Sequence, residues 1–308
     1  MYELAIIGGG PAGVAAGVYA SRKKIKTIFI TKNFESQSSV SDSIENWIGT
    51  VTIPGMELAK SLENHLRAYA ADIVDLKTGV YVKNLSKIDG GFEITYDNGE
   101  SVQAKTVLIA TGSHRRKLSV PGADTFEHKG VTYCATCDGP IFSGKDVAVI
   151  GGGNAGFESA AQLLAYAKSV TLIHKNADFK ADPVTVEAVL KDPKMKTLTN
   201  VDITEITGDK FVSGLSYKNN QTGEEGKLDV QGIFVEIGAV PTTDYAKDAV
   251  QLDEYNRVVT DPWNQRTTTD GIWAAGDCTN GIYHQNNIAA GDAVKALEDI
   301  YIYLQRNK

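Results

Sequence analysis

The sequence predicts an α/β fold made of two Rossmann-like three-layer domains, with the second domain inserted in the first. Two observations predict it. Residues 8–13 and 151–156 are glycine-rich turns, and each turn directly follows an apolar strand pattern and precedes a run of small residues typical of a helix. The pattern around the two turns is also similar, which indicates a duplicated unit rather than a solenoid of short repeats.

Each unit has the same expected order of elements. The first contains a strand, a helix, a hairpin around an Asp-Asn-Gly turn and a closing strand, expected over residues 4–7, 14–20, 92–96 with 101–104, and 106–110. The second contains a strand, a helix, a hairpin-like pair and a closing strand, expected over residues 147–150, 157–166, 212–217 with 227–230, and 232–238.

The C-terminal segment does not begin a third unit. It predicts one short strand over 272–275 and a helix over 287–304, so we expect it to return and complete the first unit. The first domain is therefore predicted over 1–114 and 244–308, and the second over 115–243. Hinges are expected near 115–117 and 240–243.

Composition excludes several classes of protein. The chain has 308 residues, a net charge of −7 and a pI near 5.3, which argue against a nucleic-acid binder and a basic membrane-surface protein. No apolar run approaches the ~20 residues of a membrane span, and the start of the chain reads as a buried strand rather than a signal peptide. Three cysteines are too few for a secreted disulfide scaffold, so we expect a cytoplasmic protein.

The two glycine turns are typical of dinucleotide sites. In this motif the first glycine makes the tight turn, the second lets the backbone approach a pyrophosphate, and the third lets the helix pack on the strand. The predicted cofactor-binding residues of the two turns are Gly8, Gly10, Pro11, Ala12 and Gly13, and Gly151, Gly153, Asn154 and Ala155.

The acidic residue that often binds the ribose about 20 residues further on is missing from both units. Thr31-Lys32 follows the second strand of unit one, and His174-Lys175 follows that of unit two. Lys175 and Lys180 could meet a 2′-phosphate, although they could equally be solvated lysines.

Cys134 and Cys137 form a Cys-x-x-Cys pair followed by Asp138. The pair could be a disulfide that opens and closes, a zinc site or two inert buried thiols. Zinc is disfavoured because Cys278 has no cysteine partner and the histidines lack ligand spacing, so we expect no metal site. Asp138 could exchange the proton that each thiol step requires, or could form the turn before Gly139. Cys278 is expected to be a small buried residue.

Seven blocks taken together resemble the low-molecular-weight thioredoxin reductases and the C-terminal part of the alkyl hydroperoxide reductase flavoprotein. The blocks are residues 8–13, 45–47, 110–112, 133–139, 151–156, 238 with 241, and 274–277. The resemblance covers nearly the whole chain. It implies FAD bound by the first domain, with contacts from Asn46, Thr111, Gly112, Gly276, Asp277, Gln285, Asn286 and Ile288 in addition to the first glycine turn.

The resemblance also implies roles for the second domain. That domain would bind NADPH or NADH, with His174, Lys175 and Lys180 near the nucleotide. Cys137 would face the flavin, Cys134 would attack the disulfide of a partner protein, and Asp138 would be the acid. In the family the two domains rotate to bring first the nicotinamide and then the dithiol to the flavin.

One departure concerns the electron donor. NADPH-dependent members carry a His-Arg-Arg-x-x-x-Arg motif, whereas this chain has His174, Lys175, Asn176 and Lys180 at those positions. Lysine lacks the planar fork of arginine, so the grip on a 2′-phosphate should be weaker.

The expected function is therefore an FAD-dependent disulfide reductase of the thioredoxin reductase type. It would pass electrons from NADPH or NADH to thioredoxin or a similar dithiol protein, and the likeness implies a homodimer. Two alternatives are a ferredoxin-dependent disulfide reductase with a vestigial nucleotide site and a non-catalytic flavoprotein redox sensor.

Overall fold

The computed structural model describes residues 1–41 and 44–307. The chain divides into two compact units: unit 1 comprises Met1–His114 and Val240–Lys308, and unit 2 comprises Arg115–Ala239. Lys308, where the predicted first domain ends, lies outside the described residues. Among the residues described, no helix is both long enough and apolar enough to cross a membrane.

Unit 1 is built on one seven-stranded sheet with the order β3-β2-β1-β6-β5-β4, in which β17 also pairs with β6. The strands are β1 (Tyr2–Ile7), β2 (Thr27–Thr31), β3 (Val74–Thr78), β4 (Val82–Ile88), β5 (Gly91–Tyr96), β6 (Ser101–Ile109) and β17 (Ile272–Ala274). The expected strands at 101–104 and 106–110 are one strand, β6. Its first half pairs antiparallel with β5 and its second half pairs parallel with β17. A single strand is therefore both the second strand of the hairpin and the closing strand of the unit.

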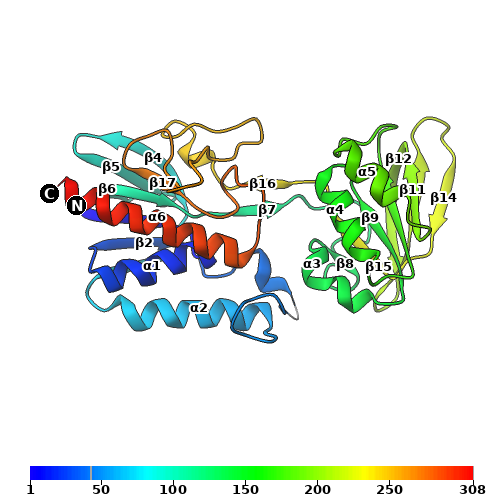
Figure 1. Cartoon of the computed structure of the whole chain (residues 1–308), viewed down its shortest axis with the longest axis horizontal. Coiled ribbons are helices and arrows are strands. Elements are labelled where there is room, and N and C mark those ends of the chain that lie inside the picture. Colours follow the sequence, from blue (N-terminus) through cyan, green and yellow to red (C-terminus); the bar gives the residue numbers. More distant parts are fainter. Residues whose placement is uncertain (42–43, 308) are drawn as a thin grey trace. The chain divides into compact units, whose positions relative to one another are not determined.

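Helices cover one face of this sheet. They are α1 (Pro11–Lys23), α2 (Gly55–Ala70) and α6 (Asn286–Arg306), and α1 packs between the other two (Figure 1). Alternation along β1 explains the layering, because Leu4 and Ile6 join the core under the helices while Ala5 and Ile7 join the core on the opposite face. That opposite core is completed by the β4–β5 hairpin, by Tyr245 of the short 3-10 helix η3 (Asp244–Ala246) and by the loop residue Val258, rather than by α-helices.

The C-terminal segment returns to unit 1 and completes its sheet and helical layer. β17 pairs in parallel with β6, and α6 packs on α1. Trp273 of β17 is buried, and its indole N–H donates to Asp299 Oδ2 of α6 at 2.9 Å, while Arg266 Nε lies 2.6 Å from the same oxygen. These contacts tie the strand and the helix of the returning segment together.

Unit 2 has a five-stranded parallel sheet with the order β11-β10-β9-β15-β8. Its strands are β8 (Val131–Thr132), β9 (Asp146–Ile150), β10 (Ser169–His174), β11 (Met195–Thr199) and β15 (Gly232–Val235). The helices α3 (Ala135–Asp138), α4 (Asn154–Leu163) and α5 (Pro183–Leu190) supply one layer. The other layer is an antiparallel sheet of β12 (Val201–Gly208), β13 (Val212–Asn219) and β14 (Glu225–Leu228), so the expected hairpin gains a third strand.

The helices that follow the glycine turns begin earlier than the sequence pattern predicted. α1 starts at Pro11 rather than at 14, and α4 starts at Asn154 rather than at 157. The reason is that Gly10 and Gly153 are themselves the N-cap residues, so the second half of each glycine motif is already helical. α4 also ends at Leu163 rather than at 166.

Two short strands, β7 (Ser113–Arg115) and β16 (Ala239–Pro241), link the units and pair with each other. The chain returns to unit 1 at Val240, earlier than the predicted 244. Hydrogen bonds explain this correction. Thr242 N donates to Gly112 O at 3.0 Å and Thr111 Oγ1 donates to Thr242 O at 2.6 Å, so the residues after β16 are held by unit 1.

A glycine substitution tests the packing of the first turn. A Cβ at Gly13 would lie 1.9 Å from Gly8 O, so Gly13→Ala should lower the free energy of unfolding by about 2–3 kcal/mol. Gly291 in α6 is the control, because a Cβ there meets no described atom within 4 Å and Gly291→Ala should stabilise the helix by about 0.5–1 kcal/mol. Urea unfolding followed by circular dichroism compares the two, and equal stabilities would contradict the packing described.

Candidate functional site

The first glycine turn brings a helix against the end of a strand. Gly8 has φ +124°, and a Cβ there would lie 2.1 Å from Ala110 O at the end of β6. Gly10 then begins α1 without a side-chain cap. The backbone N–H groups of the first helical turn are therefore left for an anionic ligand, which the positive end of the helix dipole also favours.

The second glycine turn has the same construction. Gly151 has φ +132°, and a Cβ there would lie 2.2 Å from Glu236 O, while a Cβ at Gly156 would lie 2.0 Å from Gly151 O. Around Gly153, the N-cap of α4, an added Cβ would meet no described atom within 4 Å. This position leaves room for a ligand to approach the backbone.

Both turns lie where their sheets reverse strand order. In unit 1 the chain leaves β1 toward β2 on one side and β6 lies on the other, and in unit 2 β10 and β15 flank β9 in the same way. In open parallel sheets, ligands bind at this switch point, outside the carboxyl ends of the strands. Each turn therefore has a backbone geometry that suits a phosphate-containing ligand, and the two turns are called the first and second phosphate cradles below.

The predicted site residues of the C-terminal segment lie beside the first turn. Gly276 has φ +77°, and a Cβ there would lie 3.3 Å from Ala12 Cβ and 3.2 Å from Ala289 Cβ, which puts it between the starts of α1 and α6. Asp277 Oδ2 accepts from Gln37 Nε2 at 3.1 Å, and its Oδ1 lies 3.5 Å from His284 Nδ1.

The start of α6 is joined to the segment before α2. Asn46 Nδ2 donates to Gln285 Oε1 at 3.1 Å, and Ser38 Oγ donates to Asn286 Oδ1 at 2.8 Å. Ile288, in the first turn of α6, is 38% exposed. Asn46, Gln285 and Asn286 therefore lie at the same edge of unit 1, as do Thr111 and Gly112, which follow β6.

His174 lies under the second glycine turn. Its side chain is buried, and a Cβ on Gly152 would lie 2.6 Å from its Cγ. Burial lowers the pKa of His174, and the charges of Lys180 and Lys175 lower it further. Within the described part of the chain, His174 Nε2 has no hydrogen-bond partner, so a polar group is available for a ligand at this turn.

The loop after β10 folds back on the same turn. Lys180 N donates to Gly152 O at 2.8 Å, and Asp182 N donates to Asn154 Oδ1 at 2.8 Å. Asn154 and Ala155 are exposed on the first turn of α4, and the side chains of Lys175 and Lys180 are exposed in the loop. The predicted nucleotide residues of unit 2 thus surround one helix N-terminus.

Sequence reasoning missed a buried carboxylate at this turn. Glu236 directly follows β15, and its carboxylate accepts from Ser159 Oγ at 2.7 Å and faces Arg115 Nη1 at 3.3 Å. Burial raises the pKa of Glu236, and Arg115 and Ser159 oppose that shift. The signal in the sequence was a charged residue at the end of an otherwise apolar strand.

Cys134 and Cys137 form a disulfide with a Cα–Cα distance of 5.3 Å. Cys134 is the N-cap of α3, and its Sγ accepts from Cys137 N at 3.2 Å. Both residues are partly exposed, so the alternative of two inert buried thiols is wrong. A disulfide that is partly exposed to solvent can undergo thiol–disulfide exchange.

Asp138 is held next to this disulfide by Thr132, a residue the sequence analysis did not select. Thr132 Oγ1 donates to Asp138 Oδ2 and accepts from Cys134 N at 3.5 Å. One hydroxyl thus joins the carboxylate to the backbone of the first cysteine. Cys278, in contrast, is fully buried in unit 1, and burial raises the pKa of its thiol to about 11.

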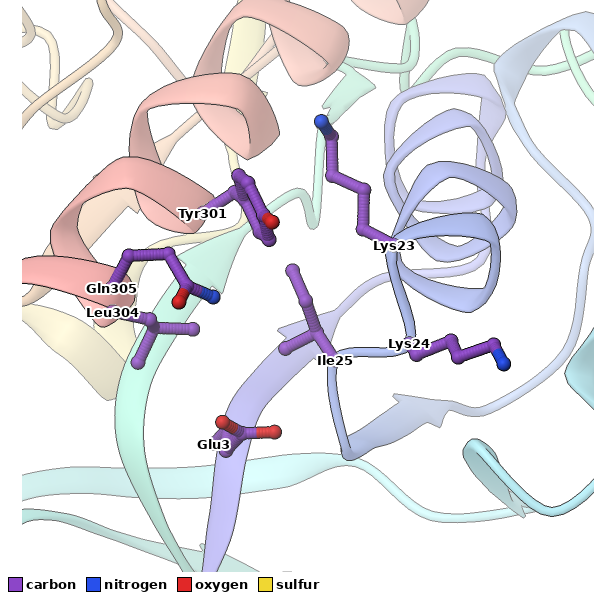
Figure 2. Close-up of a pocket in the computed structure, with 7 residues that line it drawn as sticks. All are labelled: Glu3, Lys23, Lys24, Ile25, Tyr301, Leu304 and Gln305. Carbon is purple, nitrogen blue, oxygen red and sulfur yellow. The ribbon is translucent and has the colours of Figure 1, made fainter. Parts of the chain in front are cut away.

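A pocket of about 330 Å³ lies elsewhere in unit 1, lined by Glu3, Lys23, Lys24, Ile25, Tyr301, Leu304 and Gln305 (Figure 2). These residues belong to the beginning of β1, to the end of α1 with the two residues that follow it, and to the end of α6. The pocket is therefore at the opposite end of β1 from Gly8, and it is not the phosphate cradle.

Two phosphate cradles in one chain, together with an accessible Cys-x-x-Cys disulfide, define a class of protein: the enzymes that use a flavin and a nicotinamide nucleotide to reduce disulfides. Among the described residues, no cluster of three histidine, cysteine or carboxylate side chains could hold a metal.

Comparison with known proteins supports this class. Residues 2–293 match the pyridine nucleotide-disulphide oxidoreductase family. A Bacillus subtilis (strain 168) protein called NADH dehydrogenase is 39% identical over 306 residues, covering 99% of this chain and 59% of that protein. An alkyl hydroperoxide reductase protein of Staphylococcus epidermidis is 38% identical over 306 residues, covering 99% and 60%. The structure of thioredoxin reductase from Giardia duodenalis superposes with a TM-score of 0.92 at 31% identity, covering 99% of both chains.

The chain belongs to the pyridine nucleotide-disulphide oxidoreductase family and has the thioredoxin reductase fold. The predicted family and fold class are thereby confirmed, and the family implies a flavin and a nicotinamide cofactor. The chain spans about 60% of the length of the curated relatives it matches.

The burial of His174 predicts a pH dependence. Its folded-state pKa is lowered, so protons bind the unfolded chain preferentially, and the stability due to this residue is complete above about pH 6.5 and lost as the pH falls through the folded value. His174→Asn should therefore reduce the loss of melting temperature between about pH 7.5 and pH 5. His128→Asn is the control because its ring is exposed. The same pH profile in His174→Asn and in the parent protein would contradict the assignment.

Proposed function

We propose that this enzyme passes electrons from a nicotinamide nucleotide, through FAD and the Cys134–Cys137 disulfide, to the disulfide of a thioredoxin-like protein. The observation that carries the proposal is the accessible disulfide beside an acid, in a chain with two separate phosphate cradles. A purely structural disulfide would need neither cradle, and a dehydrogenase that only transfers hydride would need no dithiol.

FAD is proposed for unit 1. The uncapped start of α1 after Gly10 suits the pyrophosphate, and Asp277 can accept hydrogen bonds from the hydroxyl groups of a ribityl chain. Asn46, Gln285 and Asn286 offer amide donors and acceptors at the same edge. When bound, the flavin would take a hydride from the nicotinamide and supply electrons to the disulfide.

The local structure suggests different roles for the two cysteines. After reduction, the N–H of Cys137 that points at Cys134 Sγ would stabilise Cys134 as the thiolate. This thiolate would attack the acceptor's disulfide, forming a mixed disulfide and releasing one acceptor thiolate. Cys137 would then attack Cys134 Sγ, which restores the Cys134–Cys137 bond and releases the acceptor as a dithiol.

Each cycle also moves protons. Asp138 is proposed as the acid that protonates a departing thiolate, because its carboxylate lies in the turn that carries both cysteines. Thr132 would orient Asp138, since its hydroxyl bonds the carboxylate while contacting Cys134 N. Thr132 is thus a positioning residue rather than a catalytic one.

The donor proposed for unit 2 is NADH rather than NADPH. The loop 174–182 carries two lysines and two aspartates, Asp178 and Asp182, so it offers no net positive charge to a 2′-phosphate. No arginine is present in this loop to bind that phosphate in a bidentate manner. The name of the B. subtilis relative, NADH dehydrogenase, agrees with this choice.

Donor preference is directly measurable. Stopped-flow reduction of the bound flavin should be at least about ten-fold more efficient with NADH than with NADPH, because the phosphate finds only exposed lysines. Replacing Lys175, Asn176 and Lys180 with arginine should raise efficiency with NADPH. A parent enzyme that uses NADPH better, or that accepts electrons only from ferredoxin, would overturn the proposed donor.

Substitution of the cysteines tests the route of electrons. Cys137→Ser should abolish thioredoxin reduction while FAD remains bound and is still reduced by the donor, since the disulfide can no longer form. Cys278→Ala is the matched control, because Cys278 is buried away from solvent and should be dispensable for turnover. Normal thioredoxin reduction by Cys137→Ser would show that the cysteine assignment is wrong.

Two further expectations stay predictions. A homodimer is implied by the resemblance to the family, and sedimentation or scattering in solution would test it. A cytoplasmic location is expected because three cysteines are too few for a secreted disulfide scaffold.

A further inference from the structure

A buried carboxylate lies in the second phosphate cradle. Val235 of β15 is in register with Ile150 of β9, and Glu236 N donates to Ile150 O at 2.8 Å, so Glu236 comes beside Gly151. The backbone of Glu236 occupies the space into which a Cβ of Gly151 would project. The residue therefore stands at the switch point of the unit 2 sheet, where a nucleotide is expected.

Two side chains hold this carboxylate. Ser159 Oγ of α4 donates to Oε1 at 2.7 Å, and Arg115 Nη1 lies 3.3 Å from Oε2. The side chain of Glu236 is only 4% exposed, whereas that of Arg115 is 34% exposed. Glu158 adds a second negative charge near the carboxylate. Arg115 is the positive group paired with it.

A negative charge at this point is unfavourable for two reasons. An ionised carboxylate is costly to bury unless it is paired and hydrogen-bonded. A nicotinamide dinucleotide also brings anionic phosphates to the same cradle, and like charges at short range in a poorly solvated site repel strongly. The counter-ion of Glu236 should therefore determine both the cost of burial and the affinity for the dinucleotide.

We propose that Arg115 is a positioning residue for nucleotide binding: it neutralises Glu236, which Ser159 fixes at the second glycine turn, so that an anionic dinucleotide can bind. The inference rests on the proposed function in one respect, which is that the cradle at 151–156 binds the nicotinamide nucleotide. Arg115 itself need not touch the ligand.

The origin of Arg115 gives the arrangement a further consequence. Arg115 is the last residue of β7, one of the two linker strands, and the neighbouring Arg116 N donates to Gly238 O at 2.9 Å. The counter-ion of the cradle is thus carried by the strand through which the chain enters unit 2. Nucleotide affinity then depends on this strand holding Arg115 against Glu236.

Three variants of the full-length protein test the proposal: Arg115→Gln, Glu236→Gln and the double variant. Binding of NADH is measured by its fluorescence under anaerobic conditions, with protein whose flavin and disulfide have first been reduced with dithionite so that NADH is not consumed. Arg115→Gln should weaken binding about ten-fold, because it leaves a bare buried carboxylate. Glu236→Gln alone should bind at least as tightly as the parent protein, and the double variant should recover to within about three-fold of it, because removing both charges removes the repulsion.

Arg116→Gln is the matched control: it removes the same charge from the next residue, whose side chain is exposed, and should leave binding unchanged. Equal affinities of Arg115→Gln and Arg116→Gln would overturn the proposal, as would a double variant no better than Arg115→Gln. If Arg115→Gln does not fold, Glu236→Gln decides alone, since weaker binding by that variant contradicts the repulsion. A parent protein that binds neither NADH nor NADPH would instead refute the proposed donor site.

Discussion

Close contact between a helix and the end of a strand is the constraint on which both units depend. At Gly8 and Gly13, and again at Gly151 and Gly156, a Cβ would fall within about 2 Å of a backbone carbonyl oxygen. No other residue type can be placed there without moving the helix. Because the helix begins directly at the turn, its N–H groups point at the crevice where the sheet reverses strand order. The same backbone geometry thus occurs once in each unit, and in both it suits a phosphate-containing ligand.

The disulfide, like the two glycine turns, lies at the N-terminal end of a helix, although this helix is short. Cys134 caps α3, and the N–H of Cys137 points at its sulfur, so the end of a helix faces a group that becomes anionic when the bond opens. Thr132 then ties Asp138 to the same turn. In unit 2 the disulfide follows β8 and the glycine turn follows β9, while unit 1 offers the amides at the start of α6 and Asp277 beside the first cradle.

Much of this could be predicted from the sequence, because the relevant patterns are local. Each glycine turn follows an apolar strand and precedes small residues, and the resemblance over seven blocks gave the family. The strand β12, which adds a third strand to the predicted hairpin of unit 2, was missed because Val201–Gly208 lacks clear alternation of apolar and polar residues. The Arg115–Glu236 pair was missed because its partners are 121 residues apart, and only the folded chain brings them together. Thr132 was missed because a threonine in a short strand carries no distinctive signal.

The account's central claim is that electrons from the nicotinamide donor reach the Cys134–Cys137 bond by way of the flavin. The most direct measurement is anaerobic incubation of the FAD-loaded protein with NADH, followed by alkylation in acid-quenched samples and mass spectrometry of the cysteine-containing peptide. The account predicts that Cys134 and Cys137 are both alkylated when FAD is bound and that neither is alkylated when FAD has been removed. A flavin that is fully bleached by NADH while both cysteines remain in the disulfide would contradict it.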